Sequence, residues 1–349
     1  MNLKFKEYSS IENVERKKEI NLIIQQGHST GQWVVSEKIH GANFSFWITK
    51  DEIKCARRSG FLGEDSAFFN FQDVKSACEK SLRDIFDYVV SIDAGVECVT
   101  IYGELFGGNY QHPDVERTYM AMSVQKGVYY NPGNKFMAFD MVLRGETSNR
   151  VMNDTFVHTT CDMFGLAHVP ILFKGTFEEC LQYPNEFQTR VPEFYGLPAI
   201  ENNIAEGVVI KPVEPKFFWN GSRVILKNKN EKWSERAKKQ KSCSDSNKEN
   251  KFDFELTVEA SKLLEDVLTY VTENRLRNVL SKMEAITDRM FGMIVGNMNR
   301  DVMADFLKDN KDAFMVLEDK ERKMITKRMG NSVMTLVRDN FVNILDNDF

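Results

Sequence analysis

The chain has 349 residues, of which 42% are hydrophobic and 28% charged, and its formal net charge is −5 at pH 7. This length favours two domains, and no apolar run reaches the roughly 18 residues that a membrane span needs. The six cysteines are scattered without a CxxC pair, which argues against a disulfide framework or a zinc site. The first residues carry no secretory leader, so we expect an intracellular, cytoplasmic protein, with a viral or phage origin and an organellar location left open.

Hydrophobic periodicity and turn residues predict a first domain of mixed strands and helices. Ser9 and Glu12 stand at the spacing of a capping box, which predicts a helix from there to about residue 24. The Asn131-Pro132-Gly133 sequence predicts a turn over 129–134. Further elements are expected as strands at 33–35, 44–48, 53–58, 98–108, 136–142, 205–212 and 223–229, and as helices at 74–90, 154–164 and 177–181.

The composition and the hydrophobic pattern of the sequence change after residue 242. Residues 243–251 are polar and aperiodic, which predicts a linker between a first domain at 1–242 and a second at 252–349. In the second part, apolar residues recur at helical spacing and proline is absent. We therefore expect an all-helical C-terminal domain.

Lys38 is the candidate nucleophile. It stands in Glu37-Lys38-Ile39-His40-Gly41-Ala42-Asn43, between two β-prone segments. A free lysine amine has a pKa near 10.4, so only about one in 2,500 is neutral at pH 7. Lys227 and Lys229 are two residues apart on an expected strand and project to one face. Such like charges disfavour the ammonium form, which predicts that they activate Lys38 and neutralise a phosphate.

Other side chains supply what nucleotidyl transfer requires. Magnesium keeps most of its waters and needs one or two carboxylates, for which Glu206 is the candidate, with Asn43 holding a metal-bound water. Phe139 offers an aromatic face to a purine, Glu104 an acceptor for ribose hydroxyls, and Arg58 a bidentate fork for phosphate. Taken singly, each of these residues is more often part of a solvated surface or a packed core than of a catalytic site.

Two kinds of site are excluded by what the sequence lacks. No GxGxxG or GxxxxGK phosphate loop is present, which excludes the Rossmann and P-loop sites. His40 has no HxxH or HExxH companion, so it is not a zinc ligand. The remaining histidines are isolated, and we assign them no chemistry; they are His28, His112, His158 and His168.

Taken in order, these residues resemble the six collinear motifs of covalent nucleotidyltransferases. The motifs are Lys38-Ile39-His40-Gly41, Arg58-Ser59-Gly60, Tyr102-Gly103-Glu104, Phe139-Asp140, the segment 206–212, and Lys227-Asn228-Lys229. The Lys-x-His-Gly form is similar to the RNA ligase 2 family, which includes phage double-strand RNA ligases and kinetoplastid RNA-editing ligases. DNA ligases and capping enzymes normally have aspartate at the position of His40. The resemblance extends to Tyr8-Ser9-Ser10 and to 270–276, so it covers nearly the whole chain.

The resemblance implies an α+β fold of two antiparallel sheets flanked by helices, with an ATP cleft between the sheets and an all-α RNA-binding domain after them. It implies an ATP-dependent RNA ligase that uses Mg²⁺ or Mn²⁺. Lys38 would take AMP from ATP, AMP would pass to a 5′-phosphate on RNA, and a 3′-hydroxyl would displace it to seal a nick in duplex RNA. Ligases of this type work as monomers without a membrane.

The resemblance also implies residue roles. The backbones of Glu37 and Ile39 would read the adenine edge. Further residues fall where the family has groups needed for catalysis or for the RNA steps; these are His40, Arg57, Arg58, Gln111, Asp154, Lys174 and Lys211. Ser36 and Lys174 stand where arginines occur in the family pattern, and both departures concern RNA-end binding.

Two alternatives belong to other classes of protein. An ATP-dependent DNA ligase or a capping guanylyltransferase usually follows the last strand motif with an oligonucleotide-binding β-barrel, and this C-terminal part lacks strand patterning. A nucleotide- or RNA-binding module without turnover would keep the cleft and lack the reactive lysine.

Overall fold

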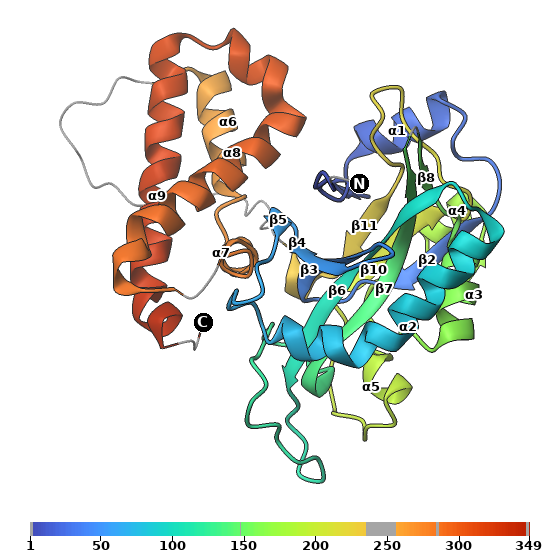
Figure 1. The fold of residues 1–349 in the computed structure, drawn as a ribbon. Coiled ribbons are helices and arrows are strands. Elements are labelled where there is room, and N and C mark those ends of the chain that lie inside the picture. The colour runs from blue at the N-terminus through green and yellow to red at the C-terminus, as the bar shows by residue number, and fades with distance from the viewer. Residues whose placement is uncertain (1–2, 147, 235–255, 284–285, 347–348) are drawn as a thin grey trace. The chain divides into compact units, whose positions relative to one another are not determined.

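The computed structural model describes residues 3–146, 148–234, 256–283, 286–346 and 349. The chain divides into two compact units, Met1–Lys232 and Trp233–Phe349 (Figure 1). The expected linker at 243–251 and the expected domain limits at 242 and 252 lie outside the described residues. Within the described part of the chain, no helix combines the length and the apolar character that crossing a membrane requires.

The first unit is built on two sheets, which confirms the predicted α+β class. The five-stranded sheet has the order β1 (Glu12–Asn13), β11 (Leu226–Lys229), β10 (Gly207–Pro212), β2 (Trp33–Glu37) and β9 (Ile171–Gly175). The six-stranded sheet has the order β5 (Gly60–Phe61), β4 (Ile53–Arg57), β3 (Ala42–Ile48), β6 (Val96–Asn109), β7 (Asn131–Gly145) and β8 (Asn149–Val151). Neighbouring strands pair antiparallel, except that β1 runs parallel to β11.

Helices cover the outer face of each sheet. On the six-stranded sheet these are α2 (Phe71–Ile92) and α3 (Asp154–Phe164), and Figure 1 shows α2 running along that sheet. Buried α2 residues such as Leu82, Ile85 and Val89 recur at helical spacing, so one face of the helix meets the strands. On the five-stranded sheet the cover is α1 (Lys17–Gln25) and α4 (Phe177–Leu181), with the short α5 (Val191–Phe194) beyond. Helices α3 and α4 begin and end at the predicted residues.

The inner faces of the two sheets meet in a mixed apolar and polar layer. Apolar residues of the layer come from both sheets, among them Trp47 and Tyr102 of the six-stranded sheet and Val209 of the five-stranded sheet. Polar ties cross the same layer. Lys211 Nζ on β10 donates to the backbone oxygen of Phe139 on β7 at 2.7 Å. Arg223 donates to Asp140 Oδ2 at 2.9 Å, and the hydroxyl of Tyr8 donates to the same oxygen at 2.9 Å.

The predicted N-terminal capping box is wrong. Helix α1 begins at Lys17, and its N-cap residue Arg16 makes no side-chain capping bond. The backbone of Glu12–Asn13 instead pairs with β11 as an edge strand, and the Glu12 carboxylate accepts a hydrogen bond from Arg16. Pairing with a strand more than 200 residues away in the sequence therefore overrides the local signal, with Glu12 opposite Leu226.

The predicted turn at 129–134 is also wrong at its centre. Strand β7 begins at Asn131, which pairs with Asn109 of β6 across an irregular register. A Cβ atom on Gly107 would lie 2.3 Å from the backbone oxygen of Gly133. Gly107 and Gly133 therefore allow β6 and β7 to approach each other closely, and the chain does not reverse its direction at Gly133. The strand expected from 223 begins only at Leu226.

The second unit is helical, as predicted. Its helices within the described residues are α6 (Val258–Leu268), α7 (Glu273–Leu280), α8 (Phe291–Val316) and α9 (Asp319–Leu345). Their apolar stripes form one core that includes Val267, Phe306 and Val333. The methionines Met298 and Met329 are buried in it, which agrees with their expected role as core filler.

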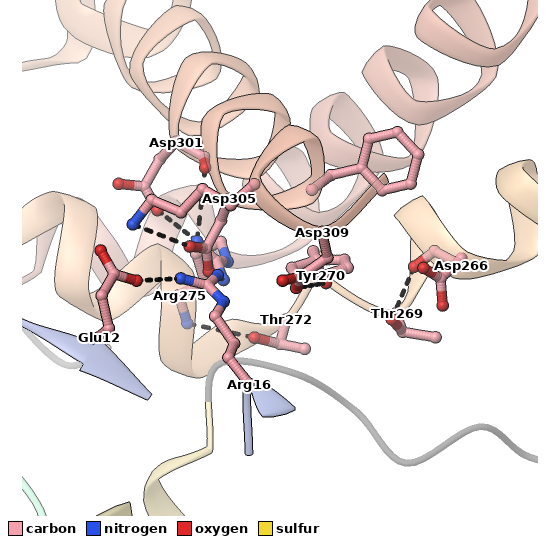
Figure 2. Close-up of polar contacts among 12 residues, drawn as sticks. Glu12, Arg16, Asp266, Thr269, Tyr270, Thr272, Arg275, Asp301, Asp305 and Asp309 are labelled. Carbon is pink, nitrogen blue, oxygen red and sulfur yellow. Dashed lines mark hydrogen bonds and ion pairs between the residues drawn. The ribbon is translucent and has the colours of Figure 1, made fainter. Parts of the chain in front are cut away.

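A buried arginine ties α7 to α8. Arg275 is 1% exposed, and its guanidinium contacts Asp301 Oδ2 at 2.6 Å and Asp305 Oδ2 at 2.7 Å (Figure 2). Nearby, the Tyr270 hydroxyl donates to Asp309 Oδ2 at 3.0 Å. Removing one partner of such a buried pair typically costs about 3–5 kcal/mol, so these contacts fix the position of α7 on α8.

Candidate active site

The segment after β2 carries the candidate nucleophile from one sheet to the other. Strand β2 ends at Glu37 and β3 begins at Ala42, and the backbone N–H of Lys38 donates to Gly207 O at 2.9 Å. The N–H of His40 donates to the hydroxyl of Tyr130 at 2.9 Å. Only glycine fits at position 41, because a Cβ atom there would lie 2.3 Å from the backbone oxygen of Leu105. These contacts hold both sides of Lys38.

A buried carboxylate lies at the centre of the site. Glu206, 1% exposed, lies just before β10, and its Oε2 is 2.6 Å from Lys38 Nζ. Its Oε1 is 2.7 Å from Lys229 Nζ, and His40 Nδ1 lies 3.5 Å from Oε2. Burial alone would raise the pKa of this carboxyl group, but the Lys229 and Lys38 ammonium groups hold it well below its usual range. We call Lys38, His40, Glu206 and Lys229 the Glu206 cluster.

The Glu206 cluster adds a contact that the sequence argument did not include. Lys227 and Lys229 were expected to act on Lys38 as neighbouring like charges. A carboxylate lies between the Lys38 and Lys229 amines, in contact with both. Lys227 lies half-buried on the same strand as Lys229, opposite Val209.

A second carboxylate lies beside the Glu206 cluster. Glu104 on β6 is directly opposite Asn43 on β3. Burial raises the pKa of Glu104 to about 7, with the Lys38 and Arg58 charges opposing the increase and Glu206 adding to it. Arg58 also pairs with Glu7, at 2.9 Å from Nε to Oε1. The structure therefore brings Glu104, Asn43 and Arg58 to the same region as Lys38.

The side chain of Glu37 is directed away from this region. Its carboxylate accepts hydrogen bonds from the Thr189 hydroxyl and, at 2.9 Å, from the backbone N–H of Arg190. Burial raises the pKa of Glu37 to about 7, and these hydrogen bonds partly counter the increase. Ile39 is 4% exposed and packs inside. Both side chains are thus engaged within the protein, so the predicted adenine contacts concern only their backbones.

Phe139, Lys211 and Asp154 form a separate buried group. The half-buried Phe139 ring lies 5.0 Å from the ring of Tyr8, centre to centre. Lys211 Nζ, already bound to Phe139 O, also lies 3.1 Å from Asp154 Oδ1. Burial would raise the pKa of Asp154, but a hydrogen bond from His158 and the Lys211 charge hold it at about 2. Lys211 and Asp154 were predicted to serve the RNA steps; here they are buried and paired with each other.

The sequence analysis missed His158. Its Nδ1 lies 3.1 Å from Asp154 Oδ2, one turn apart on α3, and its ring lies 4.5 Å from that of His168. The available signal was the spacing of an aspartate and a histidine by four residues on one predicted helix. It also missed Tyr130, whose contact with His40 has no local pattern in the sequence.

The remaining predicted RNA-step residues lie outside the Glu206 cluster. Gln111 is exposed in the loop after β6, and Lys174 is exposed on β9, opposite Val34 of β2. Arg57 ends β4 and is half-buried, directly opposite Phe44. Their roles in RNA binding stay predictions.

No group of three or more His, Cys, Asp or Glu side chains within the described ranges forms a site for a metal ion. The donor set at Lys38 nevertheless fits a hydrated divalent cation. Glu206 is a buried carboxylate whose low pKa keeps it ionised at neutral pH, and Mg²⁺ needs only one or two such ligands. A cavity of about 800 Å³ has in its wall Thr189 and Arg190, the two residues that bind the Glu37 carboxylate, together with Asn203.

Two family models match the chain. Residues 31–229 match the RNA ligase model, and 254–335 match the model described as T4 RNA ligase 2 C-terminal. The mitochondrial RNA-editing ligase 2 of Trypanosoma brucei brucei is 26% identical over 395 residues, covering 98% of this chain and 92% of that protein. The mitochondrial RNA-editing ligase 1 of that organism is 27% identical over 343 residues, covering 82% and 73%.

Solved structures resemble the chain more distantly. A mutant RNA ligase of Naegleria gruberi with AMP and Mn is 16% identical, with a TM-score of 0.45 over 66% of this chain. This chain covers 58% of that protein's length.

Proposed function

The chain belongs to the RNA ligase family, since the family model matches more than half of it, and from this premise we propose that it is an ATP-dependent ligase that seals nicks in duplex RNA. As an RNA ligase it acts on RNA. The finer proposal is that it joins a 3′-hydroxyl to a 5′-phosphate through an adenylate on Lys38. The observation that supports it is the Glu206 cluster, in which a lysine amine, a second ammonium and a buried carboxylate meet within 2.7 Å contacts.

Lys38 is the nucleophile of the first step. Its Nζ forms a bond to the α-phosphorus of ATP while the bond from that phosphorus to the bridging oxygen breaks, and pyrophosphate leaves with the electron pair. Before this step Nζ must lose a proton and leave its 2.6 Å contact with Glu206. Glu206 therefore has to turn from Lys38 as the nucleotide binds. A divalent cation held by Glu206 and an Asn43-bound water, Mg²⁺ or Mn²⁺, would supply charge neutralisation at the phosphates.

The nucleotide lies in this proposal between the two sheets. The Phe139 ring stacks on adenine, and the backbones of Glu37 and Ile39 read its edge. Glu104, opposite Asn43, accepts from the ribose. Lys227 and Lys229 on β11 bind phosphate, with Arg58 nearby. Lys211 and Asp154 act from within the protein, because their contacts hold the backbone of Phe139.

The helical unit is proposed to bind the RNA duplex, and the enzyme to act as a monomer. An A-form duplex presents a wide, shallow minor groove, so recognition there is by shape and backbone. The trypanosome relatives carry the words RNA-editing and mitochondrial in their names. On the basis of these relatives we propose RNA as the substrate of this chain. The cytoplasmic location of the chain stays a prediction.

The test is incubation with α-labelled ATP or GTP and Mg²⁺, followed by denaturation. We expect label from ATP on the wild type, none on Lys38→Ala, and full label on the control Lys50→Ala, an exposed lysine elsewhere. Label from GTP would identify a capping enzyme, and no covalent label would identify a binding module. Nicked RNA and DNA duplexes then separate an RNA ligase from a DNA ligase.

A further inference from the structure

Helix α9 presents a continuous exposed face on the side opposite its buried residues. The buried face consists of Glu321, Ile325, Met329, Val333, Val337 and Ile344. Residues three, four and seven apart share one face of a helix, and a second set at that spacing is exposed throughout. That set, which we call the α9 stripe, consists of Lys320, Lys323, Lys327, Asn331, Met334 and Arg338.

The α9 stripe contains cations and no carboxylate. The acidic residues of α9 lie off it, at Asp319, Glu321 and Asp339. Glu321 is turned inward, where its carboxylate accepts from the N–H and hydroxyl of Thr257 at 3.0 and 2.6 Å. Asp319 bonds to Arg322, and the Lys323 charge also acts on it. In a chain with a net charge of −5, this sorting of charge is a local feature.

The dimensions of the α9 stripe fit an extended anion. At a rise of about 1.5 Å per residue, Lys320 and Arg338 are about 27 Å apart along the helix axis. The four cations of the stripe, three of them between Lys320 and Lys327 and the fourth at Arg338, are spread over that length, which matches a polymer with many charges better than a single small anion. The cores of protein interfaces are depleted of lysine and enriched in aromatic residues, whereas three of the six stripe residues are lysines and none is aromatic.

We propose that the α9 stripe is a docking surface for the sugar-phosphate backbone of the RNA duplex. This inference rests on the proposed function for the identity of the polyanion. The lysines act as point charges on phosphates, so the contact carries no base specificity. Binding through the stripe releases counterions, which makes it salt-dependent. The stripe would hold the substrate while the Glu206 cluster performs the transfer of AMP.

The experiment compares two triple variants with equal loss of charge in the same unit. One removes the stripe lysines, as Lys320→Ala, Lys323→Ala and Lys327→Ala. The matched control removes exposed cations of α6 and α8, as Lys262→Ala, Arg300→Ala and Lys311→Ala. Affinity for a nicked RNA duplex is measured between 50 and 200 mM salt, and the label on Lys38 from ATP is measured without RNA.

Each phosphate contact contributes about −0.9 to the slope of log affinity against log salt, so losing three lowers its magnitude by about 2.7. The wild type should therefore lose about 40-fold more affinity than the stripe variant over that fourfold range of salt. The control should keep the wild-type slope, and both variants should label Lys38 as the wild type does.

Equal slopes for the stripe variant and the control would overturn the proposal. So would a stripe variant that binds the nicked RNA duplex as tightly as the wild type at every salt concentration. If the triple variant does not fold, as judged by its thermal melt, the single variant Lys327→Gln is tested. It should reduce the magnitude of the salt slope by about 0.9. If the wild type takes no label from ATP, the proposed function is refuted. The effect of the stripe on RNA binding is a separate measurement and would still be valid.

Discussion

Lys38 and Glu206, 168 residues apart in the sequence, are in direct contact, with 2.6 Å between Nζ and Oε2. The other oxygen of the same carboxylate contacts Lys229. The amine of the candidate nucleophile is thus engaged by an anion. In the proposed reaction this amine must leave the contact before it attacks ATP, so Glu206 would have to move first.

Glu206→Gln should lower the rate of lysyl-AMP formation, because the proposed reaction needs a buried anion at this position to hold a divalent cation beside the phosphates. The loss of one charge-assisted contact predicts a decrease of about 10- to 150-fold. Initial rates of labelling with ATP at several Mg²⁺ concentrations measure it. Glu201→Gln, an exposed control, should behave as the wild type; a Glu206→Gln variant that labels at the wild-type rate would contradict the stated role of Glu206.

Glu37 predicts a stability that falls as pH rises. Burial raises its pKa from 4.5 to about 7, so between these values the folded protein binds more protons than the unfolded chain. The free energy of unfolding should therefore decrease from about pH 4.5 to 7, by up to about 3 kcal/mol from this group. Glu37→Gln should remove that part of the decrease. Urea unfolding of the first unit at pH 5 and 8 tests it, and identical pH dependence in both proteins would contradict it.

Gly41→Ala should destabilise the first unit and abolish labelling of Lys38. The new Cβ atom would meet Leu105 O at 2.3 Å, and relief would require moving β3 from β6. Overpacking of this kind costs about 1–3 kcal/mol. The matched control is Gly63→Ala, where the nearest atom, Ser66 Oγ, is 3.6 Å away. Melting curves and ATP labelling of both variants are the measurements, and a fully active Gly41→Ala would refute the steric argument.

Arg275→Ala should destabilise the helical unit by about 3–5 kcal/mol, because Asp301 and Asp305 would lose a buried cation. The control lies two residues away on the same helix. Arg277 pairs with Glu273 at 3.3 Å on the surface, so Arg277→Ala should cost at most about 1 kcal/mol. Denaturant unfolding followed by circular dichroism separates the two, and equal losses would show that burial does not matter here.

The sequence allowed the family, the α+β class and the helical C-terminal part to be predicted, and the comparisons and the structure confirm these. Ordered motifs were enough to choose Lys38, Glu206 and Lys229 as candidates, and the structure brings these three side chains into contact. Helix α3 followed from local periodicity alone. The roles of the individual site residues stay predictions for the experiments above.

Most of the wrong or missed predictions concern contacts between residues far apart in the sequence, which no local pattern encodes. The predicted capping box at Ser9 does not form, because Glu12 pairs with β11. The predicted turn at Asn131 does not form, because Asn131 pairs with β6. The ion pair of Lys38 with Glu206 was missed for the same reason, since spacing says which charges are available and not which of them meet. His158 is a different case, because its spacing from Asp154 on the predicted helix already placed the two residues one turn apart, and that signal was overlooked.

The polar ties from Lys211 to Phe139 and from Arg223 to Asp140 have a mechanical consequence. Apolar layers can slide over one another at small cost, whereas hydrogen bonds have fixed lengths and directions. The hydrogen bonds between the two sheets thus fix the distance between them, and thermal motion should change this distance little. In the proposed function, a nucleotide that enters between the sheets would therefore bind with movements of side chains alone.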